Sequence, residues 1–108
     1  MPTLNIRLLG EFSLTYGGEV VRSLGALRLQ SLLAHLVLHR NAPESRRHLA
    51  FTLWPDSSES QARTNLRREL HNLRQSLPAA DHFLSAETQT IQWRSDAHYT
   101  LDVADFER

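Results

Sequence analysis

The side chains with the clearest binding chemistry stand on one predicted helix, between Ser58 and Leu77. Its polar positions include Arg63, Arg67, Arg68, His71, Asn72, Arg74 and Gln75. A guanidinium group forms paired hydrogen bonds with a phosphate or a guanine, and an amide side chain does the same with an adenine. Residues of these types along one helix therefore predict contact with a phosphate backbone or with the edges of bases.

The opposite face of this segment is apolar. Its members are Ala62, Leu66, Leu70, Leu73 and Leu77, at spacings of four, four, three and four residues. That periodicity predicts one amphipathic helix anchored in a core, capped by Asp56 or Ser58 and closed at Pro78. An ordinary solvated helix has the same pattern, because Glu59 and Glu69 partly offset its four arginines. Composition alone leaves both interpretations open.

Arg46 and Arg47 occupy the first turn of a second, shorter predicted helix. The helix dipole disfavours cations at this end by ~0.3–1 kcal/mol each. A phosphate bound at the same end removes the conflict, because its negative charge meets both the dipole and the guanidinium groups. The alternative is that both side chains simply extend into water. The sequence favours neither interpretation.

The sequence contains no arrangement typical of catalysis or of a cofactor site. His35 and His39 have the spacing of two metal ligands on one helix, but no glutamate lies between them and no third ligand is evident. We therefore expect an ordinary histidine pair and no metal site. The four glycines form no phosphate-binding loop, and nothing resembles a nucleophile elbow or a Ser-His-Asp triad. We expect no enzyme activity and no cofactor.

The elements that position these residues follow from alternation, turn residues and helix signals. In order, we predict strands at 4–9, 12–16 and 19–22, helices at 26–39, 46–53 and 58–77, and strands at 83–86, 90–93 and 98–101. Gly17-Gly18 is a hairpin turn signal between the second and third strands. Ser23 and Ser45 are the candidate N-caps of the first two helices, and Pro55 ends the second.

Two helices joined by a short turn, the second basic and amphipathic, make a helix-turn-helix. A β-hairpin after them makes a winged helix, in which the second helix lies in the major groove and the hairpin reaches a neighbouring groove or the backbone. The predicted fold class is therefore α+β: a winged helix-turn-helix with an N-terminal antiparallel β-meander, three helices and a C-terminal β-hairpin wing.

The net charge of zero hides an uneven distribution along the 108 residues. Residues 22–74 hold nine arginines and four acids, and nine minus four gives +5. Residues 75–108 hold two arginines and six acids, giving −4, and residues 1–21 contribute −1. The basic middle predicts a polyanionic partner. The sequence has no cysteine, signal peptide or apolar run of ~20 residues, so we expect one cytoplasmic domain without membrane contact.

Several motifs resemble those of SARP-type bacterial transcriptional activators. They are LNIRLLGEF at 4–12, LLAHLVLH at 32–39, LWPD at 53–56, ARTNLR at 62–67 and LRQSL at 73–77. The resemblance covers essentially the whole chain and implies a winged-helix DNA-binding domain of the OmpR/PhoB type over residues 1–101. The sequence at 99–107 is similar to the family's junction with a helical activator domain. Residues 102–108 are thus expected to begin a linker or that domain, cut short at Arg108.

The resemblance implies binding to double-stranded promoter DNA, often at direct repeats and as a dimer, with RNA polymerase as a further partner. The family positions that face DNA correspond to Thr64, Arg67, Arg68, His71, Asn72 and Arg74, with Arg63 near a phosphate. His48 stands where the family often has a glutamate, which weakens the cap of its helix. The predicted wing tip has no basic residue, so its DNA contacts are expected to be limited to Thr88 and Gln89.

We assign Arg67, Arg68 and Asn72 to base edges, and Arg46, Arg47, Arg63 and Arg74 to the DNA backbone. This assignment predicts sequence-specific binding with residues 58–77 in the major groove. An alternative is a winged-helix protein-interaction module without DNA binding, which the acidic C-terminal third and the wing tip without basic residues motivate. A small hydrolase or metal-dependent enzyme is a third alternative, and the missing site constellation argues against it.

Overall fold

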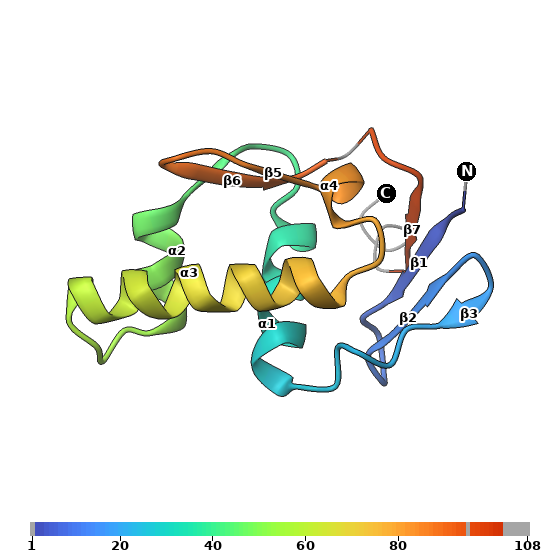
Figure 1. The fold of residues 1–108 in the computed structure, drawn as a ribbon, viewed down its shortest axis with the longest axis horizontal. Helices are drawn as coiled ribbons and strands as arrows, with labels where there is room; N and C mark the ends of the chain where they lie inside the picture. Colours follow the sequence, from blue (N-terminus) through green and yellow to red (C-terminus); the bar gives the residue numbers. More distant parts are fainter. Residues whose placement is uncertain (1, 95, 103–108) are drawn as a thin grey trace.

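The computed structural model places its helices and two small sheets around one core, and it describes residues 2–94 and 96–102 (Figure 1). The strands are β1 (Leu4–Arg7), β2 (Ser13–Tyr16), β3 (Glu19–Val20), β4 (Glu44–Ser45), β5 (Leu84–Ala86), β6 (Thr90–Trp93) and β7 (Tyr99–Leu101). The helices are α1 (Leu27–Leu38), α2 (Arg46–Leu53), α3 (Glu59–Ser76) and α4 (Ala80–Phe83). One sheet lies at the C-terminal end of α3, and the other runs alongside that helix (Figure 1).

The first sheet has the strand order β3-β2-β1-β7. Strands β1, β2 and β3 form the predicted antiparallel meander, with Gly17 and Gly18 at positive φ in the β2–β3 turn. Strand β7 pairs in parallel with β1, which local sequence patterns do not predict because the two strands lie at opposite ends of the chain.

Asp102 continues the contact between the two ends of the chain. Its carboxylate accepts hydrogen bonds from the backbone N–H groups of Leu8 and Leu9, each at 2.9 Å. Residue 102, the first of the expected linker, is therefore tied to the residues that follow β1. The rest of that expected segment, 103–108, lies outside the described residues.

Helices α2 and α3 form the helix-turn-helix, and both begin at serine caps: Ser45, as predicted, and Ser58, one of the two predicted candidates, instead of Asp56. The Oγ of Ser45 accepts a hydrogen bond from the backbone N–H of His48 at 3.2 Å, and the Oγ of Ser58 accepts one from Gln61 at 3.1 Å. The five predicted stripe residues are all buried: Ala62, Leu66, Leu70, Leu73 and Leu77. Burial of this stripe fixes α3 against the core and leaves its polar face outside.

The wing is the β5–β6 hairpin, and β4 extends it on the β6 side. Trp93 anchors the hairpin in the core: it is 0% exposed and stacks on Phe83, with ring centroids 5.4 Å apart. Figure 1 shows the hairpin running beside α3 and ending near α2. This placement brings the wing tip close to the two helices that the sequence analysis singled out.

Two predictions about local elements are wrong. Ser23 does not cap α1; the N-cap is Ala26. The Ser23 hydroxyl instead donates to the carbonyl of Ser76, and the next residue, Leu24, is buried in the core before the helix begins. Phe83 ends a fourth short helix, α4, instead of beginning a strand. One helical turn places Ala80 and Phe83 on the same side, where both are buried. The described residues thus hold four helices where the sequence predicts three.

These elements make up an α+β winged-helix fold, with an antiparallel meander before the helices and a hairpin after them. In the described part of the chain, no helix combines the length and the apolarity that crossing a membrane requires.

Candidate nucleic-acid interface

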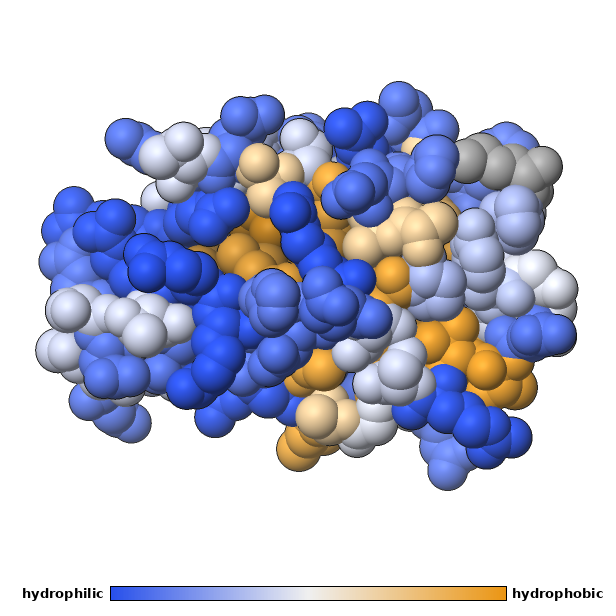
Figure 2. Space-filling view, in the orientation of Figure 1, coloured by the Kyte–Doolittle hydropathy of each residue, from blue (hydrophilic) through white to orange (hydrophobic). Residues whose placement is uncertain are grey.

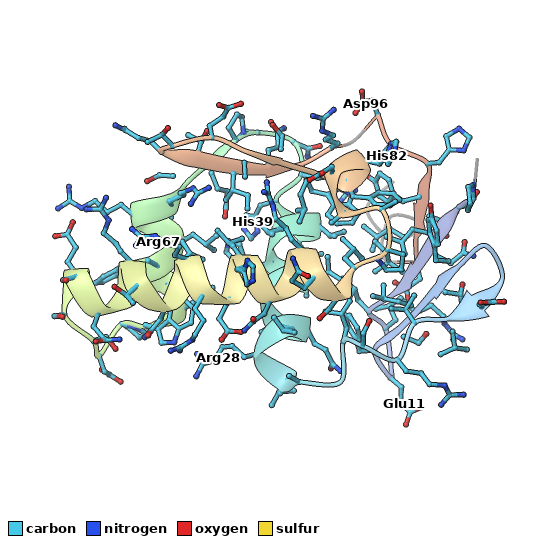
Figure 3. All side chains as sticks on the ribbon, viewed as in Figure 1. Glu11, Arg28, His39, Arg67, His82 and Asp96 are labelled. Carbon is cyan, nitrogen blue, oxygen red and sulfur yellow. The ribbon has the colours of Figure 1, made fainter. Side chains whose placement is uncertain are left out.

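The polar face of α3 divides into two flanks, because successive residues of a helix are rotated by about 100°. The wing flank carries Arg63, Arg67 and Arg74, and the outer flank carries Arg68 and Asn72, with Thr64 and His71 between them. Figure 3 shows Arg67 on the side of α3 that faces α2 and the wing. All seven side chains are exposed, so each predicted contact residue of α3 is accessible to a ligand.

A depression of about 350 Å³ lies between the wing flank of α3, the start of α2 and the wing tip. Its lining consists of Ser45, Arg46, Arg47, Glu59, Arg63, Leu66, Arg67, Thr88 and Gln89. Four arginines minus one glutamate give the lining a formal charge of +3. The space-filling view shows a hydrophilic surface over this end of the molecule (Figure 2). A concave surface with such an excess of cations attracts anions.

Arg46 is partly buried, unlike the three other arginines of this depression, which are exposed. Its Nε atom is buried, and it has no hydrogen-bond acceptor within residues 2–94 and 96–102. Burial lowers the pKa of Arg46, and the nearby guanidinium groups of Arg74 and Arg67 lower it further. All three causes oppose a positive charge that an arginine side chain nevertheless keeps at neutral pH. A bound anion would offset all of them.

The backbone N–H groups at the start of α2 are partly occupied within the protein. The N–H of Arg46 donates to the carbonyl of Gln89 in the wing tip at 2.9 Å, and that of His48 donates to Ser45. The first of these bonds joins the wing tip to the start of α2. The side chains of Thr88 and Gln89 are exposed and line the edge of the depression. Guanidinium groups, more than helix-end amides, are the donors that this site offers to a phosphate.

Arg47 differs from Arg46 in having a carboxylate partner. Its Nε lies 2.8 Å from Oε1 of Glu59, and its Nη2 donates to Oε2 at 3.5 Å. Both side chains are exposed, 76% for Arg47 and 54% for Glu59, so water screens the pair and competes with it. The pair joins two helices across their turn, so residue spacing within one helix does not predict it.

The outer flank is organised around Asn65, which is buried at 8% exposure. Its Oδ1 accepts hydrogen bonds from Nε2 of Gln61 at 2.9 Å and from Nη2 of Arg68 at 3.4 Å. The Nε of Arg68 also lies 3.6 Å from Oε1 of Glu69. This contact of Asn65 was not predicted, although an amide three residues before an arginine on a helix indicates it.

The structure therefore brings together some of the predicted contact residues and separates others. Arg46, Arg47, Arg63, Arg67 and Thr88 share one depression, and Arg74 acts on Arg46 from the same side of α3. The two residues of the outer flank do not line that depression. Within the described residues, no hydrogen bond or ion pair ties the side chains of the wing flank, whereas Arg68 is held between Asn65 and Glu69.

Among solved structures, the chain is similar to Mycobacterium tuberculosis EmbR, which was determined in complex with a low-affinity phosphopeptide. The TM-score is 0.76 and the sequence identity is 29% over 98% of this chain. The chain spans 28% of the length of that EmbR chain. The similarity agrees with the resemblance of the sequence motifs to SARP-type regulators. No protein-family model and no curated protein matches the sequence.

Proposed function

We propose that this chain binds double-stranded DNA as the DNA-binding module of a bacterial transcriptional regulator. The observation that carries the proposal is the basic depression between α2, α3 and the wing, in which Arg46 lies close to Arg67 and Arg74. A DNA phosphate supplies the negative charge and the hydrogen-bond acceptors that Arg46 lacks. The similarity to EmbR supports the same function.

In this proposal α3 lies in the major groove and its two flanks have different tasks. The base edges are read by Arg67, Arg68 and Asn72. The DNA backbone is contacted by Arg46, Arg47, Arg63 and Arg74, with additional contacts from Thr64, His71 and the wing residues Thr88 and Gln89. The contact between Asn65 and Arg68 supports a reading role for Arg68, because a guanidinium that is already oriented loses less conformational entropy when it binds.

We also propose the domain bounds, the DNA target, the partners and the cellular location of this regulator. Residues 1–101 form the DNA-binding domain, and residues 102–108 begin a linker or a helical activator domain. The target is promoter DNA with direct repeats that two copies occupy side by side, and RNA polymerase is the further partner, in the cytoplasm. Catalysis and bound cofactors have no part in this function.

Fluorescence-anisotropy binding to a pool of random duplexes, at low and at moderate salt, tests the proposal when the bound fraction is sequenced. An enriched motif, above all a direct repeat, is the expected result. Salt-sensitive binding without enrichment would retain DNA contact and assign specificity to other parts of a longer protein. No binding at low salt would contradict the proposal.

A protein-interaction module is the second candidate function, and one observation favours it. A groove of about 530 Å³ lies between α2 and the start of α3, beside Phe51 and Trp54. Phe51 lines this groove and is 66% exposed, so it offers a large apolar side chain to a protein ligand. A protein ligand would bury Phe51 with little dependence on salt, whereas phosphate binding weakens steeply as salt rises.

A further inference from the structure

A second cluster of potential ligand side chains lies where α1 ends and β4 begins. His35 and His39 are one helical turn apart, and Glu44 of β4 meets them after the intervening turn. One ligand atom from each of the three lies within 4.8 Å of the others. Glu44 supplies the third ligand that the sequence analysis did not find. We propose that His35, His39 and Glu44 bind a divalent transition-metal ion, with Zn²⁺ as the ion to test.

The three side chains already converge in the structure. The Nε2 of His35 lies 2.7 Å from Oε2 of Glu44, and the Nδ1 of His39 lies 4.0 Å from Oε1. The two imidazole rings stack, with centroids 4.1 Å apart and planes at 19°. Little conformational freedom remains to be lost when an ion replaces the hydrogen bond between His35 and Glu44.

The tautomer of His39 suits a metal ligand. Its Nδ1 lies 2.8 Å from the carbonyl oxygen of His35, so Nδ1 carries the proton and donates. In the neutral ring, Nε2 is then the atom with a free lone pair. In the structure Nδ1 is the nitrogen that lies near Glu44, so the ring of His39, which is 54% exposed, must give up its bond to the His35 carbonyl and turn Nε2 toward the ion.

The donor set and the distances fit a small tetrahedral ion. Zn²⁺ binds imidazole nitrogen and carboxylate oxygen at about 2.0–2.2 Å, which places its ligand atoms roughly 3.3–3.5 Å apart. The His35–Glu44 pair is already within that distance, and the turn of His39 closes the remainder. Three protein ligands leave the fourth position of a tetrahedral ion for a water molecule.

The electrostatic environment also favours a cation. Glu44 contributes a negative charge and the C-terminal end of α1 contributes the negative end of the helix dipole, which the guanidinium of Arg40, donating to the carbonyl of Val37 at 3.0 Å, partly offsets. An ion at this site would connect α1 to β4, and β4 pairs with β6 of the wing. Because the unfolded chain does not bring these ligands together, binding would stabilise the folded state.

Calorimetric titration of Zn²⁺ into the chain without a histidine tag tests this inference, together with thermal unfolding at increasing Zn²⁺. We expect one ion per chain. At a free Zn²⁺ concentration one hundred times the dissociation constant, the ratio of folded to unfolded protein should rise about a hundredfold. Neither measurement requires DNA, so its outcome is separate from the test of the proposed function.

His39→Gln and Glu44→Gln are the informative variants, and His82→Gln, at another exposed histidine, is the matched control. Each ligand variant should weaken Zn²⁺ binding about tenfold or more, and the control should bind like the original chain. Equal affinity in the original chain and His39→Gln would overturn the inference, as would a comparable loss in His82→Gln. If Glu44→Gln does not fold, the exposed His39 position still decides the question.

Discussion

The two flanks of α3 carry the same kind of residue in opposite surroundings. On the wing flank, Arg67 and Arg74 lie near half-buried Arg46, whose Nε has no acceptor within the described residues. On the outer flank, Arg68 is held by buried Asn65 and lies near Glu69. A charge without a partner lowers the stability of the folded chain and favours a phosphate. An arginine that is held in place is suited to selective contacts.

The largest effect on DNA affinity is expected from removing the charges of Arg46 and Arg74. The double variant Arg46→Gln/Arg74→Gln removes two contacts to phosphates, each worth about 1.5–3 kcal/mol as a hydrogen bond to a charged group. DNA affinity should fall about a hundredfold or more, by the same factor on matched and scrambled duplexes. Anisotropy titrations measure both losses. The double variant Arg7→Gln/Arg22→Gln is the control, because it removes the same charge at exposed positions outside the depression. A comparable loss in this control would contradict the assignment.

The next largest effect concerns the outer flank. Arg68→Ala should cost ~1–3 kcal/mol on the matched duplex and much less on a scrambled one, because it removes a base contact. Arg74→Ala, in contrast, should weaken binding to both duplexes alike. Parallel titrations of the two variants measure this contrast. Equal losses of Arg68→Ala on both duplexes would remove Arg68 from sequence reading.

Removing the charge of Arg46 should raise the stability of the folded chain while it lowers the affinity for DNA. Arg46→Met replaces a partly buried cation at the N-terminal end of α2 with an apolar side chain of similar length, so the free energy of unfolding should rise, by less than ~1 kcal/mol. The corresponding increase in Tm is at most about 4–8 °C. Urea and thermal unfolding measure it. Arg68→Met is the control and should bring no such gain, since Arg68 has partners. A loss of stability in Arg46→Met would show that the charge of Arg46 is compensated after all.

The smallest effect is expected at the acidic member of the depression. Glu59→Gln releases Arg47 and raises the formal charge of the lining from +3 to +4. The free energy of unfolding should fall by less than ~1 kcal/mol, because the ion pair is exposed. DNA affinity should rise roughly twofold at low salt and less at high salt. Glu11→Gln removes an exposed carboxylate elsewhere and should leave affinity unchanged. An unchanged affinity in Glu59→Gln would mean that Glu59 lies outside the binding surface.

Local patterns predict much of the fold and less of the site. The caps Ser45 and Ser58 and the buried stripe of α3 follow from spacing within a few residues, and the structure confirms them. The pairing of β7 with β1 joins the two ends of the chain, so no local pattern contains it. Similarly, the spacing of His35 and His39 on one helix does not predict that Glu44 of β4 lies beside them.

The sequence also predicts which residues are exposed on α3 better than it predicts their partners. Helical periodicity is sufficient to place Arg67 and Arg68 on the polar face. It does not show that Arg46 is half-buried beside Arg67 and Arg74, because that contact depends on how α2 and α3 pack. The division into a wing flank and an outer flank therefore emerges only from the tertiary structure.

The salt dependence of binding to duplex DNA tests the central claim most directly. The four arginines assigned to the backbone are Arg46, Arg47, Arg63 and Arg74, and each neutralised phosphate contributes about −0.9 to the slope of log affinity against log salt concentration. We predict a slope of about −3 to −4 for the original chain, with binding that is strongest at low salt. A slope near zero, or no binding at low salt, would contradict the assignment of this surface to DNA.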